Sequence, residues 1–162
     1  MSVRVVRLSY SLPPLQRWIS PTRCYIAKIL QPILVDDDAI QRLSIAAHEL
    51  LENCVKYSNG EHVQFEFEVN RDGDEAIANI RTTNSAMLSH ISDLRRRIDA
   101  MNAAVDPVAH YDEVIRESLV AGGSSLGLAR IRAESGVLLS YRVQKDIVVV
   151  LAEMPVHVRG VS

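Results

Sequence analysis

Apolar residues recur along the chain with two periods, and each period predicts a different kind of element. Alternation at every second position is typical of half-buried strands, and it predicts strands over Val3–Tyr10, Val63–Val69, Ala76–Arg81, Val137–Val143 and Ile147–Met154. Spacings of three and four predict helices over about 21–34, 38–58, 85–101, 107–120 and 126–134. This order predicts an α+β two-layer sandwich, in which a mainly antiparallel mixed sheet has helices packed on one face.

Small and polar residues mark several expected ends. Ser20 is expected to cap the first helix, with Pro21 at its first position. The run Asp36-Asp37-Asp38 offers caps for the second helix, and Gly136 is expected to end the last one. Asp72-Gly73-Asp74 predicts the turn of a hairpin between the second and third strands.

The second predicted helix carries an unusual polar stripe. Its core-facing arc comprises Ile40, Leu43, Ala47, Leu50, Leu51 and Cys54. Glu49, Asn53 and Lys56 are spaced i, i+4, i+7, which places a carboxylate, an amide and an ammonium along the margin of that arc. Such a margin can form one wall of a cleft. The simpler alternative is that the three residues belong to the solvated face of an amphipathic helix.

A glycine-rich segment precedes the last predicted helix. It reads Gly122-Gly123-Ser124-Ser125-Leu126-Gly127-Leu128, with small residues where a backbone can approach a ligand closely. Backbone N–H groups at the start of a helix bind phosphate well. The alternative is an ordinary turn that joins two helices.

Together, the polar stripe and the glycine-rich segment contain the parts needed for phosphoryl transfer. The Glu49 carboxylate can deprotonate an attacking hydroxyl, and the Asn53 amide oxygen is a suitable ligand for Mg²⁺. Lys56 supplies a point charge to phosphate, and the N–H groups of Gly123 to Leu128 would cradle it. The two motifs therefore favour a nucleotide site.

Composition narrows the class of protein. A chain of 162 residues with 48% hydrophobic and 23% charged residues predicts one globular domain. The net charge of -2 gives no field to attract nucleic acid or an anionic membrane, and Arg95-Arg96-Arg97 is interpreted as a solvated helix face. Cys24 and Cys54 fall in apolar helical patterns and are expected to be buried. Without a membrane span or a signal segment, a cytoplasmic protein is expected.

The two motifs resemble those of the GHKL, or Bergerat-fold, ATP-binding domain found in histidine kinases, gyrase and mismatch-repair ATPases. Residues 49–57 resemble its N-box and residues 123–129 its last glycine box, and the resemblance extends over about residues 38 to 154. With a glutamate four residues before Asn53, the N-box is most similar to that of the branch of anti-sigma-factor serine kinases. The resemblance implies ATP and Mg²⁺ as cofactors, with Glu49 as catalytic base, Asn53 as magnesium ligand, Lys56 as a phosphate contact, and Gly123, Ser125 and Gly127 in the phosphate loop.

The chain also departs from the family pattern. Ser125 stands where the family usually has glycine, and Cys54 where it usually has alanine. The family's Asp-x-Gly-x-Gly box, whose aspartate binds the adenine amino group, is replaced by Thr82-Thr83-Asn84-Ser85-Ala86. Thr82 and Asn84 are the candidate replacements, although a neutral hydrogen bond is roughly half as strong as a charge-assisted one. A predicted helical pair at about 85–120 occupies the ATP-lid region.

Two functions remain open. The first is a bacterial partner-switching regulator that uses ATP and Mg²⁺ to phosphorylate a small regulatory protein, antagonist or sigma-factor-like, on Ser or Thr. The second is a degenerate, non-catalytic GHKL module that binds a partner protein without nucleotide. The apolar positions from Met87 to Met101 are interpreted as core, with a homodimer or partner-helix seam as the alternative.

Overall fold

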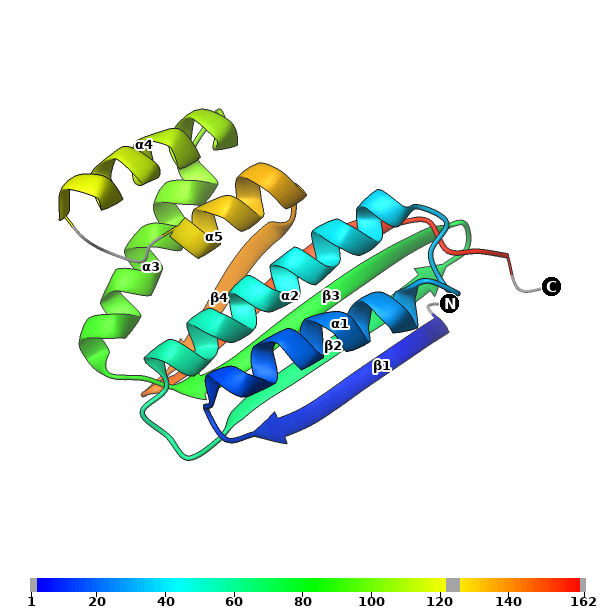
Figure 1. Ribbon diagram of the computed structural model, residues 1–162, viewed down its shortest axis with the longest axis horizontal. Coiled ribbons are helices and arrows are strands. Elements are labelled where there is room, and N and C mark those ends of the chain that lie inside the picture. Colours follow the sequence, from blue (N-terminus) through cyan, green and yellow to red (C-terminus); the bar gives the residue numbers. More distant parts are fainter. Residues whose placement is uncertain (1–2, 122–125, 161–162) are drawn as a thin grey trace.

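The computed structural model describes residues 3–121 and 126–160. Within them, one sheet has the strand order β1-β2-β3-β5-β4, and neighbouring strands run antiparallel (Figure 1). The strands are β1 (Val3–Leu12), β2 (Val63–Asp72), β3 (Glu75–Ser85), β4 (Leu138–Gln144) and β5 (Ile147–Val156). The predicted strands and the α+β class are confirmed, and the sheet is antiparallel at every described pairing.

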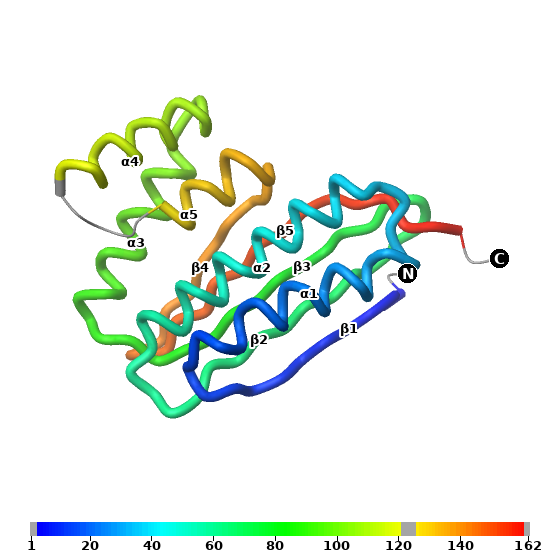
Figure 2. Tube along the Cα trace, viewed as in Figure 1, coloured from blue at the N-terminus to red at the C-terminus, as the bar shows by residue number. Residues whose placement is uncertain are grey.

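The helices pack on one face of this sheet (Figures 1 and 2). They are α1 (Ile19–Leu30), α2 (Asp37–Tyr57), α3 (Leu88–Ala103), α4 (Pro107–Ala121) and α5 (Leu126–Arg130), with a 3₁₀ turn η1 (Gln16–Trp18) and a π-helical turn η2 (Ile131–Ser135). Helices α1 and α2 lie side by side along the strands, whereas α3 and α5 lie toward β4 and α4 lies outside them. Gly136 ends η2 in the left-handed conformation, with φ of 64°, as its position predicted.

The core lies between the helices and the sheet. Phe65, Phe67 and Ile80 from the strands are fully buried, and so are Leu50 and Leu51 from α2. Alternate residues of the same strands face away from the helices and are mostly polar or charged. Glu66, for example, accepts hydrogen bonds from Arg7 at 2.9 Å and Arg81 at 3.3 Å. This alternation explains why a period of two located the strands correctly.

The first helix differs from its prediction. It begins at Ile19, so that Ser20 and Pro21 lie inside its first turn and the expected Ser20 cap is wrong. The reason is η1, whose Gln16 carbonyl already accepts the Ile19 N–H and leads the chain directly into the helix. The second helix behaves as expected, because the Asp36 side chain accepts the Asp38 N–H at 2.9 Å.

Two further expectations, on the cysteines and on α3, have different outcomes. Cys54 is buried, but Cys24 is exposed on α1, so the expected burial of Cys24 is wrong. In α3, Ile91, Ile98 and Met101 are buried and Leu94 packs against the core, which confirms the interpretation of these four positions as core. Met87 precedes the helix and is 52% exposed, so the interpretation of that position as core is wrong.

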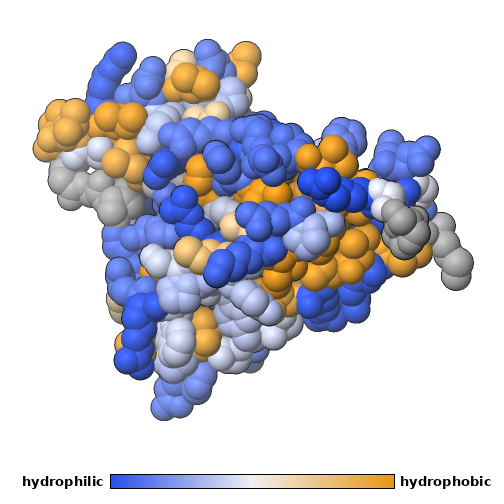
Figure 3. All heavy atoms as spheres, turned by 45° about the vertical axis from the view of Figure 1, so that its right-hand side comes forward, coloured by the Kyte–Doolittle hydropathy of each residue, from blue (hydrophilic) through white to orange (hydrophobic). Residues whose placement is uncertain are grey.

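Helix α4 differs from α3 because it has no fully buried side chain among residues 107–120, all of which are at least partly exposed. Its exposed apolar side chains include Val108, Leu119 and Val120. Figure 3 shows apolar side chains at the surface in the upper part of the molecule, where α4 lies.

Candidate functional site

Helix α2 positions the predicted polar stripe. The whole predicted core-facing arc from Ile40 to Cys54 is buried, which fixes the rotation of the helix over the sheet. With this rotation Glu49 and Asn53 are partly buried at the margin of the core, and Lys56 is exposed. The stripe therefore lies where α2 faces α5, with Arg97 of α3 lining the same cavity, rather than on an isolated solvated surface.

A cavity of about 270 Å³ lies between α2 and the start of α5, and we call it the α2–α5 cavity. It brings together six of the predicted site residues, namely Glu49, Asn53, Lys56, Leu126, Gly127 and Leu128. The other members of the glycine-rich segment, Gly122, Gly123, Ser124 and Ser125, lie outside the described residues. Carboxylate, amide and ammonium groups thus share one cavity with the first turn of α5.

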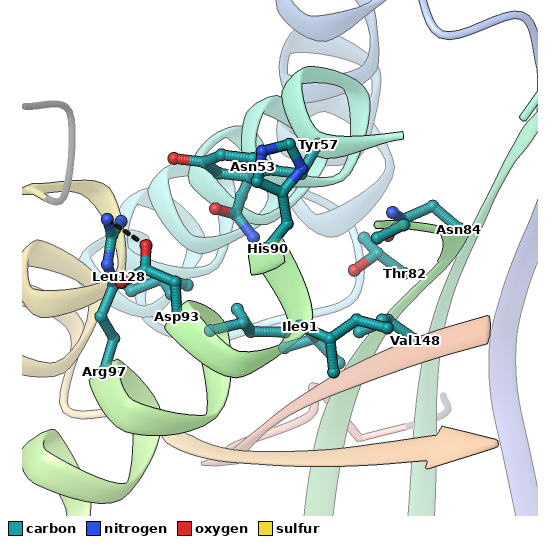
Figure 4. A pocket seen from close by; sticks show the side chains of 13 residues that line it. Asn53, Tyr57, Thr82, Asn84, His90, Ile91, Asp93, Arg97, Leu128 and Val148 are labelled. Atoms are coloured by element: carbon teal, nitrogen blue, oxygen red, sulfur yellow. Dashed lines mark ion pairs between the residues drawn. The ribbon is translucent and has the colours of Figure 1, made fainter. Parts of the chain in front are cut away.

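A second pocket adjoins the cavity, and we call it the β3 pocket. Thr82 and Asn84 of β3 line it, together with Tyr57 of α2 and His90 and Asp93 of α3 (Figure 4). The two spaces share four lining residues and therefore adjoin each other: Asn53, Tyr57, Arg97 and Leu128. The β3 pocket has room for only about 20 Å³, enough for about one water molecule.

Thr82 and Asn84 are buried polar residues, and each has a hydrogen-bond partner within the protein. Asn84 Nδ2 donates a hydrogen bond to the Ser85 carbonyl at 3.0 Å. Thr82 is 1% exposed, and its side chain forms a hydrogen bond with the Cys54 thiol. Burial raises the pKa of this thiol to about 12. The thiol is therefore protonated and inert. Neither β3 residue brings a charge to the pocket.

Glu49 is the most strongly perturbed carboxylate of the site. Its pKa is raised, chiefly by burial and then by the nearby charge of Glu52, while Arg130 and His48 act in the opposite direction. Arg130 Nη1 lies 3.3 Å from Glu49 Oε1, and Arg130 Nε donates a hydrogen bond to Glu134 at 2.8 Å. A perturbed carboxylate in a cavity is a candidate for proton transfer.

Five residues that line the cavity were not predicted as site residues: Glu52, Tyr57, Arg97, Tyr111 and Arg130. Arg97 was interpreted as part of a solvated face, which is wrong for this residue, because its side chain is only 24% exposed and is ion-paired with Asp93. Arg96 fits that interpretation, with its side chain 76% exposed. The available signal was the spacing of Asp93 and Arg97, four residues apart on one helix face.

The donor set suits a magnesium ion that is shared with phosphate. Within residues 3–121 and 126–160, no three His, Cys, Asp or Glu side chains gather as a metal-binding group. Mg²⁺ does not need such a cage, because it commonly uses one or two protein oxygens together with substrate phosphates and water. The Asn53 amide oxygen, in a cavity large enough for phosphate, fits this mode of binding.

Comparisons with known proteins identify the fold and no family. No model of a protein family matches the chain, and no curated protein matches it. The chain is similar to one in the crystal structure of the SiaB-SiaC complex from Pseudomonas aeruginosa, with a TM-score of 0.65 and 19% sequence identity. The alignment covers 94% of this chain and 91% of that one. In the part of the chain that the structure describes, no helix has both the length and the apolar character to cross a membrane.

Proposed function

We propose that this protein is a GHKL-like signalling regulator of the partner-switching type, which binds ATP with Mg²⁺ and phosphorylates a small antagonist protein on Ser or Thr. One observation carries the proposal. Glu49, Asn53, Lys56 and Gly127 line one cavity, and the β3 pocket that contains Thr82 and Asn84 adjoins it. The first space suits phosphates and the second lies where a base would enter.

The chemistry assigns a part to each side chain of the cavity. Glu49 accepts the proton of the attacking hydroxyl, whose oxygen forms a bond to the γ-phosphorus while the bond to the β–γ bridging oxygen breaks and ADP leaves. Asn53 would hold Mg²⁺, which when bound would supply charge neutralisation to the phosphates. Lys56 and Arg97, which come from α2 and α3, add positive charge on the same cavity.

Two observations support a protein as the second substrate. The similar solved structure contains a complex of two proteins, SiaB and SiaC. In this chain, α4 lies beside the site and exposes Leu119 and Val120, which are 81% and 90% exposed. Exposed apolar side chains on a helix that also contributes Tyr111 to the cavity suit the docking of a partner.

The β3 pocket favours a second candidate function. Its volume of about 20 Å³ does not admit a nucleobase, so ATP binding requires α3 to move away from Thr82 and Asn84. Neither residue replaces the charge of the family's aspartate. A non-catalytic module that binds a regulatory protein without nucleotide is the function that this narrow pocket favours.

Calorimetric titration of ATP with Mg²⁺ separates the two functions. The wild-type protein is expected to bind with a micromolar dissociation constant, and Asn53→Ala to bind at least about 10-fold more weakly, equivalent to 1.4 kcal/mol. Asn79→Ala is the matched control, because Asn79 lies on the sheet face away from the helices, near Arg7 and Glu66. Circular dichroism establishes that each variant is folded. Absence of binding by the wild type, at concentrations that detect millimolar affinity, contradicts the kinase and leaves the non-catalytic module.

A further inference from the structure

We propose that Arg130 is the positioning residue for Glu49, and that its guanidinium holds the carboxylate against Gly127 so that it faces the α2–α5 cavity. This inference rests on the proposed function, since it concerns the side chain that serves there as the base. Glu49 is on α2 and Arg130 is on α5, which are 81 residues apart in the chain. The pair therefore exists only when the two helices are packed together.

Arg130 is held from two sides. Its Nη1 lies 3.3 Å from Glu49 Oε1, while its Nε donates to Glu134 Oε2 of η2 at 2.8 Å. A guanidinium is planar, so two bonds from different nitrogens fix both its position and the direction in which it presents its N–H groups. Glu134 therefore orients Arg130, and Arg130 in turn orients Glu49.

Gly127 bounds the carboxylate on another side. A Cβ atom added at Gly127 would collide with Glu49 Oε2, which shows that the carboxylate oxygen occupies the space left by the missing side chain. One carboxylate oxygen is thus paired with Arg130 and the other lies against the α5 backbone. The Glu49 side chain is only 11% exposed, in keeping with this confinement.

The charges around Glu49 act on the ionisation of its carboxyl group in both directions. Besides Arg130, the titratable groups on the surrounding elements are His48, Glu52, Lys56, Arg97, Tyr111 and Glu134. Burial and Glu52 disfavour the ionised carboxylate, which is the form that can accept a proton, whereas Arg130 favours it. Arg130 therefore fixes the direction of the carboxylate and opposes the rise in the pKa of Glu49 that burial and Glu52 cause.

The test uses Arg130→Met, Arg130→Lys, Glu49→Gln and the double variant Glu49→Gln/Arg130→Met. Arg116→Met is the matched control, because Arg116 is exposed on α4 and is not among the cavity residues. Carbon-13 NMR of the side-chain carboxyl, assigned by its loss in Glu49→Gln, measures the pKa of Glu49 in the ligand-free protein. Steady-state hydrolysis of MgATP, with water as acceptor, measures kcat and KM without a partner.

Arg130→Met is expected to raise the pKa of Glu49 further and to lower kcat by roughly 10- to 100-fold, with KM for ATP changed less than about 3-fold. Arg130→Lys is expected to restore part of both the pKa of Glu49 and kcat, because lysine keeps the positive charge but lacks the forked N–H donors of the guanidinium. In the Glu49→Gln background, Arg130→Met is expected to have no further effect on kcat. Arg116→Met should match the wild type.

Different results would overturn the positioning of Glu49 by Arg130 and the proposed kinase activity. If the wild type hydrolyses ATP and Arg130→Met leaves both kcat and the pKa of Glu49 unchanged, the positioning of Glu49 by Arg130 is overturned and the kinase stands. If Arg130→Met and Arg130→Lys shift the pKa as expected but the wild type neither binds nor hydrolyses ATP, the kinase is overturned and the positioning stands.

Discussion

The Tyr57 ring of α2 meets the His90 ring of α3 edge-on, with ring centroids 5.0 Å apart and an interplanar angle of 62°. Both residues line the β3 pocket, so the contact joins two of its walls (Figure 4). Thr82 and Asn84 lie in the same pocket. The ring pair therefore restrains α3 in the position that leaves the pocket almost filled.

His90→Ala is predicted to strengthen ATP binding. Removal of the ring lowers the cost of moving α3 outward, and an aromatic edge contact is worth about 0.5–1.5 kcal/mol. The dissociation constant for MgATP should therefore fall by roughly 2- to 10-fold, as measured by calorimetry. His62→Ala is the control, since His62 is exposed in the segment between α2 and β2. Unchanged or weaker binding by His90→Ala would show that the ring contact does not close the pocket.

Much of the fold was predictable because it depends on local periodicity. The alternation of Phe65 and Phe67 with charged neighbours identifies β2, since a half-buried strand needs one apolar residue in two. The start of α1 was not predictable from Ser20 and Pro21, because η1 brings the chain into the helix through a backbone turn that carries no sequence signature. Local cap signals compete with such turns, and here the turn prevails.

Some features of the candidate site could likewise be predicted from the sequence, and others could not. Glu49, Asn53 and Lys56 were predictable because all three lie on one helix, where spacing alone determines which side chains are neighbours. Arg130 was not predictable as the partner of Glu49, since their ion pair joins residues 81 positions apart. The narrowness of the β3 pocket also depends on long-range packing, because α2, α3 and β3 all contribute side chains to it.

Gly127→Ala is predicted to impair catalysis while preserving the fold. The added Cβ would displace the Glu49 carboxylate, which is the flexible end of a side chain and can move at little cost to stability. A misplaced base loses rate, on the order of 100-fold for a shift of about 1 Å. MgATP hydrolysis should fall accordingly, while the circular dichroism spectrum stays that of the wild type.

Gly160→Ala provides the matched control for this substitution, because no atom lies within 4 Å of the position of its added Cβ. Wild-type hydrolysis by Gly127→Ala would mean that the carboxylate does not need its place beside α5.

Leu94→Glu and Leu119→Glu should affect stability very differently. Leu94 packs against the core and lines the β3 pocket, so a carboxylate there is predicted to lower the free energy of unfolding by about 2–4 kcal/mol. Leu119 is 81% exposed on α4, and the same change should stay within about 0.5 kcal/mol. Urea denaturation measures both values. A small effect at Leu94 would instead favour the partner-helix seam for α3.

Glu49→Gln is predicted to stabilise the protein at neutral pH. The pKa of Glu49 in the folded chain lies above its ordinary value of 4.5, because burial and Glu52 disfavour the ionised carboxylate more than Arg130 favours it. Above the folded pKa, ionised Glu49 therefore lowers stability, and the neutral isostere should raise the free energy of unfolding by up to about 1 kcal/mol at pH 7. As the pH falls through the folded pKa and below 4.5, wild-type Glu49 takes up its proton and the advantage of the variant disappears.

Urea denaturation of the wild type and Glu49→Gln at pH 7 and pH 4 tests this dependence, because the difference between the two proteins cancels the titration of other groups. Glu113→Gln, at an exposed position on α4, should differ from the wild type by less than about 0.5 kcal/mol at either pH. Lower stability of Glu49→Gln at pH 7 would show that the ion pair with Arg130 outweighs the burial of the carboxylate. In that case Glu49 would be held mainly as a structural partner of α5, and a second residue would have to act as the base.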